Sequence, residues 1–173
     1  ITMRRFVLKS MIAAMTVLAL GSAHAQVNER TFKLNIQNPK GHPMEVGAQK
    51  LADTVAAKSG GKMKIKVFPG GQLGGDAQTV SALQGGTIEM TVLNSGILAA
   101  QVKDFEVYDY PFVFANSKEA DTVVDGPFGK NLHAKLEAKN IVGLGYWELG
   151  FRNLTNSKRA ILKVEDIAGL KLR

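Results

Sequence analysis

The sequence of 173 residues contains no cysteine, only three histidines and a single tryptophan. A fold without disulfides has to be held by an apolar core, and hydrophobic residues make up 45% of the chain, which is enough for one. The shortage of cysteine and histidine argues against a cysteine nucleophile and a zinc centre, because only His42 and His133 lie beyond the first 25 residues. We therefore expect no metal, no cofactor and no catalytic residues.

Long apolar runs are also absent, apart from one that extends from Met11 to Leu20. That run has about half the length of a membrane-spanning helix. A basic head at residues 3–9 precedes it, and small residues ending at Ala25 follow it. This order predicts a signal peptide over residues 1–25, cleaved after Ala25, and hence a secreted protein that does not span the membrane. The Arg4-Arg5 pair leaves twin-arginine export open beside the general route.

The net charge is modest once the signal peptide is set aside. Removing three cations (Arg4, Arg5 and Lys9) and no acid lowers the formal charge from +7 to +4. The remaining lysines are spread along the chain and do not alternate with aromatic residues, which argues against a nucleic-acid partner. A mild positive field favours anionic small molecules.

Apolar residues alternate with polar ones in three short segments, and two helical patterns separate these segments. The alternation predicts strands at 32–36, 63–67 and 88–92. Apolar residues at helical spacing predict helices over 44–55, ended by glycines, and over 76–83, opened by Asp76. The resulting β-α-β-α-β order is typical of an α/β fold with a mainly parallel sheet flanked by helices.

The second half of the sequence is less regular. Bulky residues over 105–114 indicate a packed crossing segment, and helices are predicted from Ser117 and over 128–136. Residues 141–147 are predicted to form a fourth strand. Ligands of parallel α/β sheets bind beyond the carboxyl ends of the strands, so we expect the site in the loops that follow them. These loops are 38–43, 69–76, 94–99 and 147–152.

The run from Phe68 to Asp76, Phe-Pro-Gly-Gly-Gln-Leu-Gly-Gly-Asp, lies between a lysine-rich strand and a helix. It resembles the solute-binding proteins of tripartite ATP-independent periplasmic (TRAP) transporters, the DctP type. Further motifs follow in that family's order and approximate spacing: His42-Pro43, Thr87–Met90, Asn94–Gly96, Tyr110–Phe112, Trp147, Gly150–Arg152 and Gly169–Arg173. The resemblance covers Gln26–Arg173, about the N-terminal half of the family's usual length.

This resemblance implies a two-lobed periplasmic binding protein of type II-like architecture, whose lobes close around a small organic acid. The acid is a C4-dicarboxylate, a 2-oxoacid or a sugar acid, and the closed receptor delivers it to the small and large membrane subunits of the transporter. Residues 26–149 correspond to most of lobe I, and residues 150–173 to a hinge strand and the start of lobe II. The last residues, Leu170–Arg173, have the pattern of the middle of a strand, so the sequence is interpreted as a fragment.

Two arginines match family positions that contact the ligand. Arg173 matches the arginine that grips the ligand carboxylate, and Arg152 a second arginine near it. A guanidinium suits this task because it offers two parallel donors, stays charged and is more easily desolvated than an ammonium. Without the resemblance, both would be interpreted as surface cations.

Five further residues are candidate ligand contacts, each with a structural alternative. Asp76 opens a helix and is also suited to be its N-cap, whereas Asn94 and Ser95 end a strand and Asn94 also suits a turn. Trp147 either stacks on the ligand or packs in the core, and His42 is either a contact or a turn residue. Two alternative functions stay open: a periplasmic sensor that signals to a kinase, and an α/β periplasmic enzyme, for which no nucleophile or general base is evident.

Overall fold

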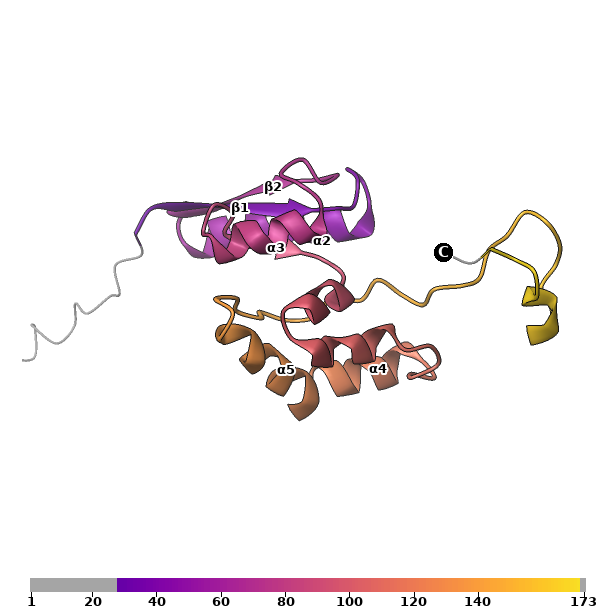
Figure 1. Cartoon of the computed structure of the whole chain (residues 1–173). Helices are drawn as coiled ribbons and strands as arrows, with labels where there is room; N and C mark the ends of the chain where they lie inside the picture. Colours follow the sequence, from indigo (N-terminus) through magenta and orange to yellow (C-terminus); the bar gives the residue numbers. More distant parts are fainter. Residues whose placement is uncertain (1–27, 172–173) are drawn as a thin grey trace, which may run out of the picture. The chain divides into compact units, whose positions relative to one another are not determined.

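A computed structural model describes residues 28–171 (Figure 1). The chain folds into two compact units, one up to Leu93 and one from Asn94 on. The predicted signal peptide over residues 1–25 and the predicted ligand arginine Arg173 lie outside the described residues.

The first unit is built on a parallel sheet of three strands in the order β2-β1-β3. The strands are β1 (Arg30–Ile36), β2 (Met63–Phe68) and β3 (Met90–Val92), and the helices α2 (Pro43–Lys58) and α3 (Asp76–Gln84) connect them (Figure 1). The predicted order of strands and helices and the α/β class are confirmed.

The two helices cover opposite faces of the central strand β1. Leu34 and Ile36 are buried together with Ala48 of α2, whereas Asn35, which points to the other face, hydrogen-bonds to Thr79 of α3. Successive side chains of a strand point to opposite faces, so both faces of β1 are covered. Partly buried side chains complete the core on the α2 face: Met44, Leu51, Ile65, Val67, Met90 and Val92.

The second unit consists of short helices. It contains the 3-10 helices η2 (Ser95–Ala100) and η3 (Lys103–Asp109), followed by α4 (Ser117–Val124), α5 (Pro127–Glu137) and a last 3-10 helix η4 (Val164–Ile167). Its core is formed by Phe105, Leu132 and Leu136, which are at most 2% exposed. Both predicted helices are confirmed.

Of two further sequence-based predictions for this unit, one is wrong and one is confirmed only in part. Residues 141–147 form no strand, because a strand requires a hydrogen-bonding neighbour and no segment within 28–171 pairs with them. The crossing segment is packed in its first part, where Phe105 is buried and Val107 and Tyr108 pack against the same core. Farther on, Phe112 is fully exposed with a positive φ of 61°.

Within residues 28–171, no helix combines the length and apolar character that crossing a membrane requires.

Candidate functional site

A buried amide holds the loop between β2 and α3 in place. Asn35 of β1 donates from Nδ2 to the Gly74 carbonyl (3.0 Å) and to Oγ1 of Thr79 (2.7 Å), and its Oδ1 accepts from the Leu73 amide (3.3 Å). Gln37 donates a further hydrogen bond to Gly74 O (2.9 Å). Both the nitrogen and the oxygen of the Asn35 amide therefore fix the loop that precedes Asp76, a role that the sequence pattern does not reveal.

The loop is also joined to the carboxyl end of β1 by its backbone. Gly70 N donates to Asn38 O (2.9 Å) and Gly71 N to Ile36 O (3.0 Å). Gly71 has a φ of 69°, which favours glycine, and a Cβ there would lie 2.6 Å from Oε1 of Gln37, so the Gln37 side chain would have to move. The two loops after β1 and β2 therefore meet at one edge of the sheet, as predicted.

Asp76 is the first residue of α3 and does not cap it. The N-cap is Gly75, whose amide donates to Oε1 of Gln78 (2.9 Å). The alternative prediction that Asp76 is an N-cap is wrong, because the chain turns into the helix one residue earlier. Its Oδ1 is buried, and no hydrogen-bonding partner for it exists in the described part of the chain. An acceptor in this state is suited to a donor supplied by a ligand.

The buried Asp76 carboxyl should make the free energy of unfolding depend on pH. Burial raises its pKa, so the folded protein binds a proton at a higher pH than the unfolded chain does. The desolvation cost is therefore present at neutral pH and is relieved as the pH falls through the raised pKa.

Asp76→Asn removes that cost, so we expect any stability advantage of the variant to be larger at about pH 7 than at about pH 4. Urea denaturation of both proteins at the two pH values measures the difference. A difference that does not change with pH would contradict the assignment.

His42 is the N-cap of α2. Its Nδ1 accepts from the Met44 amide (3.2 Å), and its Nε2 lies 3.4 Å from Nδ2 of Asn38. Because Nδ1 accepts, the neutral ring carries its proton on Nε2, and the Asn38 amide is best oriented with its oxygen toward it. Of the two alternatives for His42, the structure shows the turn residue, at the point where the loop enters α2. A ligand contact of this ring stays a prediction.

Asn94 and Ser95 lie at the start of η2 in the second unit. Oδ1 of Asn94 accepts from the Gly96 amide (3.0 Å), so this residue forms the turn that its sequence position suggested. Its side chain is exposed and Ser95 is half-buried. Their roles as ligand contacts stay predictions.

Trp147 and Arg152 lie in a segment without regular secondary structure. The Trp147 side chain is 40% exposed, which does not fit the alternative of core packing within this unit. Arg152 is exposed, and no residue within 28–171 forms an ion pair with it. Both side chains are therefore accessible to a ligand.

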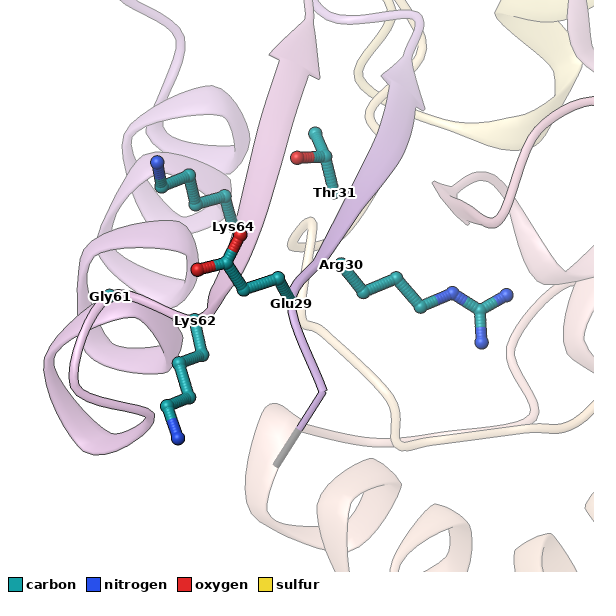
Figure 2. A pocket seen from close by; sticks show the side chains of 6 residues that line it. All are labelled: Glu29, Arg30, Thr31, Gly61, Lys62 and Lys64. Carbon is teal, nitrogen blue, oxygen red and sulfur yellow. The ribbon is translucent and has the colours of Figure 1, made fainter. Parts of the chain in front are cut away.

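A shallow hollow of about 290 Å³ lies at the opposite end of the sheet, where β1 and β2 begin (Figure 2). It is lined by Glu29, Arg30, Thr31, Gly61, Lys62 and Lys64. Figure 2 shows the Arg30 side chain extending away from Lys62 and Lys64, so the cations do not converge on one point. None of the candidate residues lines this hollow, and ligands of parallel sheets bind at the carboxyl ends of the strands. It is therefore not the predicted site.

The described residues offer no metal centre. No group of three or more His, Cys, Asp or Glu side chains gathers within 28–171. The candidate residues with groups open to a ligand are Asp76 in the first unit, through its buried acceptor, and the exposed Arg152 and Trp147 in the second.

Comparison with known proteins identifies relatives over most of the chain. Residues 34–173 match the model of the DctP family, described as bacterial extracellular solute-binding protein, family 7. The 2,3-diketo-L-gulonate-binding periplasmic protein of Escherichia coli is 31% identical over 162 residues, which make up 94% of this chain and 48% of that protein.

Solved structures agree with this match. A TRAP periplasmic solute-binding protein from Ochrobactrum anthropi has a TM-score of 0.81 and 54% identity, covering 85% of this chain and 46% of its own. A sugar acid binding protein from Advenella mimigardefordensis, in complex with galactonate, has a TM-score of 0.80 and 42% identity, covering 84% of this chain and 47% of its own. The chain thus spans about half the length of these relatives. It belongs to the DctP family of extracellular solute-binding proteins, as the motifs around Phe68–Asp76 predicted.

Proposed function

We propose that the full-length protein is the periplasmic receptor of a TRAP transporter, which captures a small organic acid and delivers it to the small and large membrane subunits. The observation that carries this proposal is the match to the galactonate-bound protein at 42% identity. Residues 26–149 form most of lobe I and residues 150–173 the hinge and the start of lobe II in this proposal. The lobes close on the ligand, and no bond is made or broken.

In the proposed site, arginine cations bind the carboxylate of the ligand, and hydrogen-bond acceptors of the protein bind its hydroxyl groups. Arg173 and Arg152 pair with the ligand carboxylate through their guanidinium donors, as the family resemblance implies. Trp147 supplies an aromatic face, and Asn94, Ser95 and His42 are further polar contacts. Asp76 accepts hydrogen bonds from the ligand, because its Oδ1 is buried without a partner among the described residues.

The Asp76 carboxylate favours a sugar acid over a C4-dicarboxylate. A sugar acid carries one carboxylate and several hydroxyl donors, so it supplies both the anion for the arginines and the donors for Asp76. A second carboxylate placed near Asp76 would be repelled by the like charge. A sugar acid is also the ligand bound in the galactonate complex.

Calorimetric titration of the full-length protein with galactonate, succinate and a 2-oxoacid tests this ranking. We expect galactonate to bind more tightly than succinate, and NMR spectra of the mixture to show the acid unchanged after prolonged incubation. Conversion of the bound acid would favour an enzyme, and absence of binding to any of the three acids would remove the proposed function.

Asp76→Asn tests the acceptor role. The amide keeps the shape of the side chain but loses the charge, and hydrogen bonds to charged groups contribute about 1.5–3 kcal/mol, so galactonate affinity should fall roughly 10- to 150-fold. Succinate affinity should be unchanged or higher. Asp53→Asn is the matched control, since Asp53 is exposed on α2. Equal losses for galactonate and succinate would contradict the role in selectivity.

A further inference from the structure

The segment that leads to Trp147 is held by contacts of its side chains and not by the backbone hydrogen bonds of a helix or strand. Residues 141–148 have no regular secondary structure, although Ile141 N donates to Leu136 O (3.2 Å) at the end of α5. A segment of this kind keeps one conformation only if its side chains are fixed by their neighbours. Two such attachments stand immediately before and after Trp147.

The first attachment is an aromatic clasp formed by Tyr108, His133 and Tyr146. The His133 and Tyr146 rings stack with centroids 4.3 Å apart and planes 9° apart. The Tyr108 hydroxyl donates to the Tyr146 hydroxyl (3.1 Å), which in turn donates to Gly129 O (3.3 Å). Successive hydrogen bonds of this kind strengthen one another. The Tyr146 side chain is therefore fixed both on its face and at its hydroxyl.

The backbone of the segment passes directly over the same histidine ring. A Cβ added to Gly143 would lie 2.3 Å from Cγ of His133, so only glycine fits there, whereas a Cβ on Gly145 meets nothing within 4 Å. Burial lowers the pKa of His133, which favours the neutral ring in this contact. The ring is thus enclosed between the backbone at 143 and the side chain of Tyr146.

The second attachment follows Trp147. Oε1 of Glu148 accepts a hydrogen bond from the Ser117 hydroxyl (2.5 Å) at the start of α4. Trp147 thus lies between two residues whose side chains are attached to helices of this unit, and it is itself 40% exposed. A change in either attachment would therefore be felt at Trp147.

We infer that the aromatic clasp is a positioning device for the ligand site: Tyr146 and His133 orient Trp147 and the following residues to Arg152 without touching the ligand themselves. The inference rests on the proposed function, in which Trp147 and Arg152 contact the acid. An anchor without this role would affect stability only.

A pair of glycine substitutions in the full-length protein tests the inference. Gly143→Ala forces the backbone away from the His133 ring, and Gly145→Ala is the matched control in open space. We expect Gly143→Ala to weaken galactonate binding about 3- to 30-fold and Gly145→Ala to leave it unchanged. The fluorescence of Trp147, obtained as the difference from a Trp147→Phe background, should shift to the red and become more easily quenched in Gly143→Ala only.

Substitutions of the histidine keep the test decisive if Gly143→Ala fails to fold. His133→Ala removes the stacking partner and should reproduce the affinity loss and the fluorescence shift, whereas His133→Phe restores a stacked ring and should restore both. A loss of thermal stability in His133→Ala with wild-type affinity and an unchanged Trp147 signal would overturn the inference. If the wild type binds none of the three acids, the proposed function fails by itself; the Trp147 signal of His133→Ala then supports or overturns the positioning role.

Discussion

Replacing Arg173 by alanine is expected to weaken the binding of a carboxylate ligand roughly 30- to 4,000-fold, because truncating one partner of a buried, hydrogen-bonded charge pair costs about 2–5 kcal/mol. Most of that cost arises from the ligand carboxylate, which is left without its partner after losing water. Arg173→Lys keeps the charge but removes the parallel pair of donors, so an intermediate loss is expected. Calorimetric titration of the full-length protein measures all three affinities.

Lys171 supplies the matched control for this prediction. It is an exposed cation two residues before Arg173 in the sequence, so Lys171→Ala removes the same charge from a neighbouring position of the chain. Surface charges of this kind contribute little at ordinary ionic strength, and binding should stay within about twofold of the wild type. Equal losses in Lys171→Ala and Arg173→Ala would point to the general positive field of the protein and would contradict a specific contact.

Asn35→Leu is expected to lower the free energy of unfolding by about 2–4 kcal/mol. The leucine keeps the branched shape of the side chain, although it is larger, and it leaves buried polar groups without partners: the Leu73 amide loses its acceptor, and the Thr79 hydroxyl loses a donor. The loop before Asp76 should loosen at the same time. Urea denaturation measures the stability, and hydrogen exchange at the Leu73 amide reports on the loop.

Two controls separate the buried hydrogen bonds from the general effect of an asparagine-to-leucine change. Asn131→Leu makes the same change at an exposed position of α5 and should alter stability by no more than about 0.5 kcal/mol. In the double variant with Thr79→Val, the two losses should not add, because both remove the same hydrogen bond. Strict additivity would contradict the direct coupling of Asn35 with Thr79.

The sequence pattern predicts the first unit well because its signals are local. Alternation in β1 and β2, and the glycines that end α2 and α3, follow from residue types a few positions apart. Asn35 illustrates what alternation misses: the pattern places it among the polar residues of β1, yet it is fully buried. The expectation of a sheet with helices on both faces already implied that a central strand is covered on both sides.

The second unit was harder to predict because its structure depends on contacts between distant residues. Residues 141–147 have the apolar content of a strand, but strand formation requires a partner, and here His133 and Tyr108 supply contacts to side chains instead. In the first unit, Asp76 is not the N-cap for a local reason: Gly75 together with Gln78 forms the helix start, and the preference of aspartate for caps does not decide between adjacent residues.

The proposed function depends on recognition of a carboxylate by arginine, and a matched pair of ligands tests that claim most directly. Galactonate and galactitol have similar hydroxyl groups, but only galactonate has a carboxylate. Calorimetric titration of the full-length protein should give saturable binding of galactonate and an affinity for galactitol that is lower by at least roughly 30-fold, the smallest effect expected for a buried charge pair. Equal affinity for the two compounds would contradict the claim.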